Sequence, residues 1–403
     1  MTVPFEGPQT IYFPQGFSFS TATAGIKASG RPDLAFAEAV PGTTAAAVFT
    51  KNRLVAAPVI VGRAVLAATL GRVRAVLVNS GNANCATGKA GMQACQRTCR
   101  ETARLLGLRA SEIFPSSTGI IGVPLPDEKI LAHLPELMAA REATEAGLRQ
   151  FASTILTTDT RAKIASAEIR DGKNSASLVG VAKGSGMIHP QMATMLVYLF
   201  TDIAATPAEL KRLLRNACDE SFNCISVDGD TSTNDTVLLM ASGKSGVRIK
   251  NARKKFVAAL LQVCQSLSEQ IVCDGEGVQH VIRLIVEQAK SREEALQIAR
   301  AVSHSLLVKT AWAGADPNWG RILAAVGYSG LNIDPARVSI LIGEQTVCRN
   351  GVAHAFNQEE AHQHLAQPRS EIRIRLQRGH ASVNFLTTDL TAEYVHINAD
   401  YST

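Results

Sequence analysis

Strand-like apolar runs alternate with amphipathic helical patterns along the whole of this 403-residue chain. The run at 371–376 alternates strictly between apolar and polar residues, which is typical of a strand with one solvated face. The alternation of strand-like and helical segments along the chain predicts an α/β fold in which layered sheets are covered by helices. The runs expected to form strands are 74–78, 194–200, 236–240, 280–286, 338–342 and 371–376.

Two segments show helical spacing, with apolar residues three and four positions apart at 92–106 and at 256–267. Cys95 and Cys99 lie one turn apart in the first, but no further ligand follows at zinc-finger spacing, so we expect them in the core. Capping boxes predict two more helix starts, one at Thr206 with Glu209 and one at Ser291 with Glu294.

Composition excludes several classes of protein. The net charge is only +6 and no cluster of Lys and Arg forms a stripe, so we expect no nucleic-acid partner. No apolar run reaches the roughly 20 residues of a membrane-spanning helix, and the first residues lack a secretory signal. The eight cysteines have no framework spacing. We therefore expect a cytoplasmic protein with reduced thiols that is not bound to a membrane.

Three familiar ligand-binding motifs are incomplete. Gly243-Lys244-Ser245 lacks the first glycine of a phosphate loop, since position 238 is Leu. Gly184-Ser185-Gly186 lacks the third glycine of a dinucleotide fingerprint. The run beginning at Asp228 has neither the glycine nor the glutamate of a calcium loop. We therefore expect no metal, nucleotide or flavin cofactor.

The segment from Lys183 to Leu196 carries the strongest chemical signal. Gly184 and Gly186 permit tight turns, Pro190 stops a helix, and an apolar strand follows. The ordinary interpretation is a loop entering a strand in which Thr194 is merely a good β-residue. The alternative is that the constrained loop holds the carbonyl of Ala193 against the hydroxyl of Thr194, so that the chain cuts itself.

Several long motifs in the same order resemble the ornithine acetyltransferase family of arginine biosynthesis, also described as bifunctional glutamate N-acetyltransferases. The resemblance implies cleavage between Ala193 and Thr194, with an α chain of residues 1–193 and a β chain of residues 194–403 in an α2β2 assembly. It also implies a fold shared with self-processing aminopeptidases. The motifs are Asn79–Asn84, Ser117–Gly122, Thr157–Thr160, Lys183–Leu196, Asp230–Asp235, Asp274–Gly277, Asp316–Arg321 and Asn398–Thr403.

The resemblance implies a ping-pong transfer of acetyl from N2-acetylornithine to glutamate through acetyl-Thr194. The oxyanion would be stabilised by Thr118 and Gly119. Acetyl-CoA is a candidate co-substrate, because the family contains both monofunctional and bifunctional members. The substrate contacts implied for this chain are Thr157, Lys183, Thr194, Glu276, Asn398 and Thr403.

Two other functions remain open from the residues. A self-processing aminopeptidase or amidase of the same fold would end in hydrolysis, whereas a non-catalytic amino-acid-binding protein would remain uncut. His189, five residues before Thr194, also suggests a rival mechanism in which a histidine serves as the general base.

Overall fold

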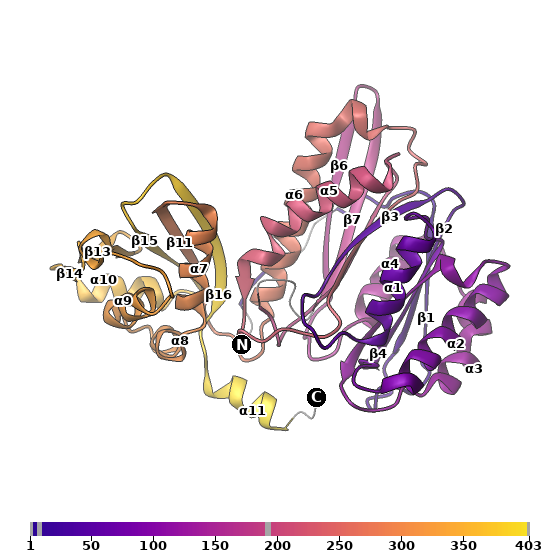
Figure 1. Cartoon of the computed structure of the whole chain (residues 1–403), viewed down its shortest axis with the longest axis horizontal. Helices are drawn as coiled ribbons and strands as arrows, with labels where there is room; N and C mark the ends of the chain where they lie inside the picture. Colours follow the sequence, from indigo (N-terminus) through magenta and orange to yellow (C-terminus); the bar gives the residue numbers. More distant parts are fainter. Residues whose placement is uncertain (1–2, 6–9, 190–194, 401–403) are drawn as a thin grey trace.

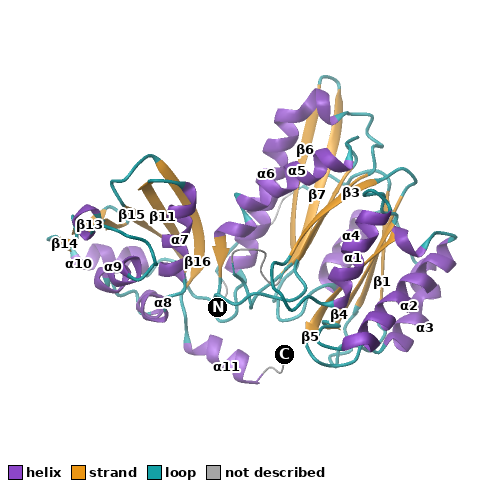
Figure 2. Cartoon of the chain, viewed as in Figure 1, coloured by secondary structure: helices purple, strands orange, loops and turns teal. Residues whose placement is uncertain are grey.

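The computed structural model describes residues 3–5, 10–189 and 195–400. Three β-sheets with helices packed on their faces make a layered, mixed α/β structure (Figure 1; Figure 2). This confirms the α/β class predicted from the alternation. Ala193, Thr194 and Thr403 lie outside the described residues.

The first sheet has four strands in the order β1-β2-β4-β5. Strands β1 and β2 pair antiparallel, as do β2 and β4, whereas β4 and β5 run parallel. Helices α2 and α3 pack together over the outer face of this sheet. The strands are β1 (Phe17–Ala22), β2 (Leu34–Ala39), β4 (Ala75–Asn82) and β5 (Ile113–Ile120); the helices are α1 (Ala57–Ala68), α2 (Gly88–Leu106), α3 (Asp127–Ala139) and α4 (Glu145–Thr154).

The second sheet has five strands in the order β3-β10-β8-β7-β6. Strands β3, β6 and β7 precede residue 190 in the chain, whereas β8 and β10 follow residue 194. The two halves of the sequence are therefore interleaved in one sheet. The strands are β3 (Thr44–Phe49), β6 (Lys163–Asp171), β7 (Asn174–Lys183), β8 (Leu196–Thr201) and β10 (Thr236–Ala241).

An aromatic cluster joins the first two sheets. Phe151 of α4 packs edge-on against Phe19 of β1 and Tyr198 of β8, with ring centroids 5.7 and 5.4 Å apart. Phe200 of β8 contacts Phe19 directly at 5.1 Å. All four side chains are fully buried, and burial of each contributes about 1.5–3 kcal/mol to folding. The core between these sheets fixes their separation.

Helices α5 (Pro207–Asp219) and α6 (Ile249–Cys273) cover the outer face of the second sheet. The capping box at the start of α5 is confirmed, because Thr206 Oγ1 accepts from the amide of Glu209 while the Glu209 carboxylate accepts from that of Thr206. In the described part of the chain, α6 alone is long and apolar enough to cross a membrane. It is mostly buried and packs on β6 and β7, as expected of a core helix.

The third sheet has seven strands and forms the lobe on the left in Figure 1. Ile372 and Ile374 of β15 are fully buried while Arg373 and Arg375 are partly exposed, which confirms the predicted half-solvated strand. The strands are β9 (Ile225–Ser226), β11 (Val281–Ala289), β12 (Ser339–Ile342), β13 (Gln345–Arg349), β14 (Val352–Ala353), β15 (Arg369–Arg375) and β16 (Ala381–Thr388); the helices are α7 (Arg292–Ser303), α8 (Leu306–Ala313), α9 (Trp319–Gly327) and α10 (Gln358–Leu365).

The last helix, α11 (Ala392–Asp400), leaves the third sheet after β16 and runs back toward the first two sheets (Figure 1). No residue of α11 is fully buried. Its position brings residues 392–400 to the place where the third sheet approaches the first two (Figure 1).

Candidate active site

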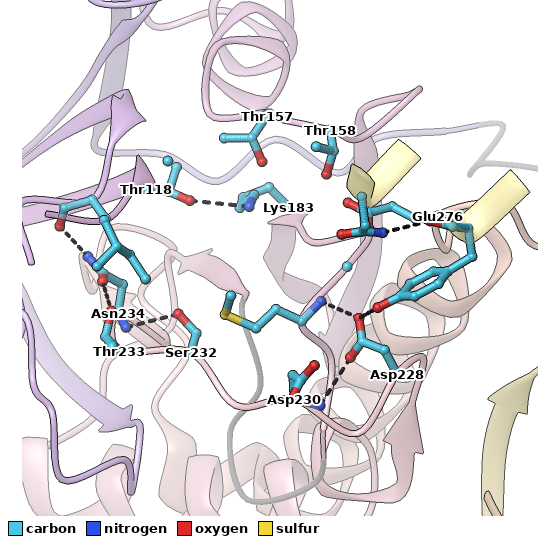
Figure 3. A pocket seen from close by; sticks show the side chains of 17 residues that line it. Thr118, Thr157, Thr158, Lys183, Asp228, Asp230, Ser232, Thr233, Asn234 and Glu276 are labelled. Carbon is cyan, nitrogen blue, oxygen red and sulfur yellow. Dashed lines mark hydrogen bonds between the residues drawn. The ribbon is translucent and has the colours of Figure 1, made fainter. Parts of the chain in front are cut away.

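A cavity of about 240 Å³ lies between the ends of β5 and β7, the loop before β10 and helix α11 (Figure 3). Six of the residues expected at the site line this cavity, although they come from distant parts of the sequence. Ala193, Thr194 and Thr403, which were also expected at the site, fall outside the described residues. The six are Thr118, Gly119, Thr157, Lys183, Glu276 and Asn398.

Gly119 lies near the end of β5, where the backbone of β4 comes very close. Its φ is 132°, and a Cβ atom built there would lie 2.2 Å from the carbonyl carbon of Gly81. Only glycine fits at that separation, because any side chain would overlap the neighbouring strand. The close approach of the two strands fixes the position of Thr118 beside it.

Lys183 ends β7 with its side chain buried, and its Nζ donates a hydrogen bond to Thr118 Oγ1 at 3.2 Å. Burial lowers the pKa of Lys183, and the nearby carboxylate of Asp159 opposes that shift. Among the lining residues that the structure describes, Lys183 is the only cation. It therefore provides the positive end of the cavity.

A buried ion network, which does not itself line the cavity, fixes the backbone next to Lys183 and at Thr157. Lys163 Nζ donates to one carboxylate oxygen of Asp159 and one of Asp274, both at 2.6 Å, and all three side chains are inaccessible to solvent. Asp159 also accepts from the backbone amides of Gly184 at 2.6 Å and Thr157 at 3.1 Å. Burial alone would raise the pKa of Asp159, but the ammonium groups of Lys163 and Lys183 lower it below its usual value.

The opposite end of the cavity is acidic. Glu276 accepts a hydrogen bond from Asn398 Nδ2 of α11 at 2.9 Å, and Asp228 and Asp230 lie nearby in Figure 3. The Asp228 carboxylate accepts from the backbone amides of Met187 at 2.5 Å and Ile188 at 2.8 Å. Burial raises the pKa of Asp228 to about 6 despite these hydrogen bonds. The cavity thus has one cationic end and one anionic end.

His189 does not line this cavity. Its Nδ1 lies 3.2 Å from Nε2 of His304, and both rings border a separate surface groove with Arg300. Burial, followed by the charge of Arg300, lowers the pKa of His189 to about 4. His189 is therefore a weak base that is already paired with His304, which gives the rival histidine mechanism no support.

Sequence reasoning did not select several lining residues as site residues. Asp228 entered only as part of a rejected calcium loop, and Asp230 also belongs to the Asp230–Asp235 motif but was given no role. The polar run from 228 to 235 was a usable signal because it precedes a buried strand. Tyr394 had no signal in the sequence. The lining residues missed are Ala83, Ile121, Thr158, Gly186, Met187, Asp228, Asp230, Ser232, Thr233, Asn234 and Tyr394.

The described residues contain no group of three His, Cys, Asp or Glu side chains placed to hold a metal ion. Cys95 and Cys99 are free and buried in helix α2, as predicted for core residues. What the cavity offers chemically is a pair of oppositely charged ends with hydroxyl and amide groups between them.

Comparison with known proteins gives consistent matches along the chain. The sequence model of the ArgJ family matches residues 18–403. The arginine biosynthesis bifunctional protein ArgJ of Thermus thermophilus is 44% identical over 396 residues, which cover 98% of this chain and 100% of that protein. The protein of the same name from Methylococcus capsulatus is 43% identical over 394 residues, covering 96% and 95%. A solved structure of ornithine acetyltransferase complexed with ornithine, from Mycobacterium tuberculosis, is 36% identical over 45% of this chain and 94% of that chain, with a TM-score of 0.39.

Proposed function

This chain belongs to the ArgJ family, and we propose from that premise how its residues carry out the reaction. It is an acyltransferase of arginine biosynthesis that moves the acetyl group of N2-acetylornithine to glutamate, releasing ornithine and N-acetylglutamate. We assign the reaction to this cavity because residues from 83 to 398 meet around it, with one cation and three carboxylates.

Maturation begins with the hydroxyl of Thr194. Its oxygen attacks the carbonyl carbon of Ala193, the C–N bond breaks, and the acyl group passes to oxygen as an ester that water hydrolyses. The products are the α chain of residues 1–193 and the β chain of residues 194–403. Cleavage converts an amide nitrogen into an α-amine with an ordinary pKa near ~8, which serves as general base for the adjacent hydroxyl.

Acetyl transfer then takes two steps. Thr194 Oγ attacks the acetyl carbonyl of acetylornithine, the α-amine passes the hydroxyl proton to the departing amine, and ornithine leaves the acetyl-enzyme. The amine of glutamate attacks the ester in turn, which restores the free hydroxyl and predicts ping-pong kinetics. Thr118 and Gly119 stabilise the oxyanion of each tetrahedral intermediate, as donors aimed at developing charge do.

The charged ends of the cavity suit the two ends of ornithine. Lys183, supported by Thr157, binds the α-carboxylate, and Glu276 with Asp228 binds the δ-ammonium through charge-assisted hydrogen bonds. Asn398 orients Glu276, and Thr403 adds a further hydrogen bond at the end of the chain.

The acidic end repels the side-chain carboxylate of glutamate, so we infer that the acceptor lies differently in the cavity. The variant Glu276→Gln should then impair the use of acetylornithine more than that of glutamate. Separate measurement of the two half-reactions tests this, and equal impairment of both would contradict different placement.

A denaturing gel and mass spectrometry test the central proposal. Processing predicts two fragments of about 20 and 22 kDa from the 42.9 kDa precursor. Incubation with acetylornithine should add one acetyl group to the fragment that begins with Thr194, and the variant Thr194→Ala should remain whole and unacetylated. Transacetylation by an uncut chain would refute the mechanism.

A self-processing amidase is the alternative. It would release free acetate from acetylornithine without glutamate at a rate comparable to transfer, whereas the proposed enzyme requires the amine acceptor. An assay with acetyl-CoA as sole donor determines whether the chain also uses that second donor.

We further propose a cytoplasmic α2β2 assembly without membrane or nucleic-acid partners. All eight cysteines are free and buried, which suits a reducing compartment. An assembly of this composition has a mass of about 86 kDa, twice 42.9 kDa, which size-exclusion chromatography with light scattering would measure.

A further inference from the structure

The polar segment from Ser232 to Asp235 contacts both strand β5, which carries Thr118 and Gly119, and Met195, the residue before strand β8. Asn234 is buried within it, and its side-chain Nδ2 donates to the carbonyl oxygen of Ala83 at 2.7 Å and to that of Ser117 at 2.9 Å. Figure 3 shows Asn234 at the wall of the cavity, beside Thr233 and Ser232. One amide group therefore ties the loop before β10 to the ends of β4 and β5.

The contact with Ser117 acts on the proposed oxyanion site. The carbonyl of Ser117 and the amide of Thr118 belong to one planar peptide group, so holding the carbonyl fixes how Thr118 and then Gly119 are oriented. Asn234 itself cannot turn freely, because its Oδ1 accepts from Thr233 Oγ1 at 2.6 Å. Both Nδ2 hydrogens and the amide oxygen of Asn234 thus have assigned partners.

The same segment also holds the strand that follows Thr194. Asp235 Oδ1 accepts from the amide of Met195 at 2.9 Å, and the amide of Thr236 donates to the carbonyl of Met195 at 3.1 Å. Both backbone groups of Met195, the residue directly after Thr194, are therefore bonded to residues 235 and 236. Asn234 and Asp235 are adjacent, so the two attachments share one short piece of backbone.

We propose that Asn234 is a positioning residue for acetyl transfer, which sets the Ser117–Thr118 peptide in register with the strand that follows Thr194. The proposal rests on the proposed function, since it assigns the oxyanion site to Thr118 and Gly119. A misplacement of about 1 Å in reacting groups can cost about 100-fold in rate. Loss of the Asn234 amide should therefore slow the chemical step while substrate binding at the charged ends continues.

Gln270 provides a matched control. It is a buried carboxamide whose Nε2 donates to the carbonyl of Ile164 at 2.9 Å and whose Oε1 accepts from the amide of Ile164 at 3.1 Å. It does not line the cavity. The variants Asn234→Ala and Gln270→Ala each remove a buried amide with its hydrogen bonds, so they should lower the melting temperature by similar amounts.

The kcat for acetyl transfer should distinguish Asn234→Ala from Gln270→Ala. Per mole of processed chain, Asn234→Ala should lose about 10- to 100-fold in kcat with KM for acetylornithine within about twofold, whereas Gln270→Ala should keep its kcat. The nearly isosteric Asn234→Asp should show a kcat that rises relative to wild type as pH falls, because only the protonated carboxyl can donate to the Ser117 carbonyl. A purely structural role would not produce that pH dependence.

A kcat for Asn234→Ala within twofold of wild type would overturn the proposal, as would equal losses in Gln270→Ala. If the ratio of the kcat of Asn234→Asp to that of wild type is constant with pH, the proposal is also overturned. Asn234→Asp provides the test if Asn234→Ala fails to fold. Wild-type protein is first tested for acetyl-Thr194. If no acetyl-enzyme forms, the proposed function fails, whereas acetylation of Asn234→Ala at the wild-type rate refutes only the role of Asn234.

Discussion

Replacement of Lys163 by Met is expected to destabilise the protein strongly at neutral pH. Lys163 Nζ lies 2.6 Å from a carboxylate oxygen of Asp159 and of Asp274, and these three side chains are fully excluded from solvent. In the described residues the only other ion pair to either carboxylate is that of Arg161 with Asp274, at 3.9 Å. Methionine fills a similar volume but leaves two carboxylates in a site of low polarity. Removing one partner of a buried ion pair lowers the free energy of unfolding by about 3–5 kcal/mol.

This cost converts into a measurable melting shift. At about 2.1 cal/mol/K per residue, a 403-residue chain unfolds with an entropy of about 0.85 kcal/mol/K, so a loss of 3–5 kcal/mol lowers Tm by about 4–6 °C. Lys255→Met is the control, because among the described residues the one hydrogen bond of Lys255 Nζ goes to the backbone oxygen of Arg170 at the surface, at 2.9 Å. Thermal unfolding followed by tryptophan fluorescence at pH 7.5 should separate the two variants.

The direction of the pH effect follows from Asp159. Lys163 and Lys183 hold its pKa below the usual value, so the ionised carboxylate stabilises the folded state above the unfolded pKa of about 4, and this stabilisation is lost as pH falls through the folded pKa. Without Lys163 the carboxyl of Asp159 takes up a proton more readily. The loss of Tm in Lys163→Met relative to wild type should therefore be largest at pH 7.5 and smaller near pH 4.5. A Tm equal to that of Lys255→Met, or a deficit that grows on acidification, would refute this reasoning.

Three further outcomes are expected. Gly119→Ala should abolish acetyl transfer in a standard activity assay, because its Cβ would lie 2.2 Å from the carbonyl carbon of Gly81, and normal activity would contradict the close approach. The KM for acetylornithine should rise as pH falls through about 6, where Asp228 loses its charge, and Asp228→Asn should remove that inflection from the pH profile. Thr206→Ala should cost about 1 kcal/mol of stability in chemical denaturation without affecting kcat, since it removes only the capping box with Glu209.

The fold class could be predicted from the sequence because its signals are local. The capping box at Thr206, the buried alternation at 371–376 and the helical spacing at 256–267 each depend on residues close together in the chain. The sheet order could not be predicted in this way. Strand β3 pairs with β10 across almost 200 residues, and no local pattern specifies such a partner.

Some residues of the candidate site could likewise be predicted from local motifs, whereas others are brought to it only by the fold. Gly119 and Lys183 belong to recognisable motifs, whereas Tyr394 lines the cavity only because α11 runs back from the third sheet. Asn234 lies in the Asp230–Asp235 motif before strand β10, but no residue pattern assigned it a role. Its role depends on the carbonyl groups of Ala83 and Ser117, whose proximity only the folded chain reveals.

The interleaving of the second sheet has a consequence for maturation. Strands β7 and β8 are paired along six residues on either side of the proposed cut, and β10 is paired with β3 from the opposite fragment. Scission therefore leaves two polypeptides joined by continuous backbone ladders, which we expect to copurify until a denaturant separates them. For the same reason, neither fragment expressed by itself can complete the sheet, so folding must come before the cut.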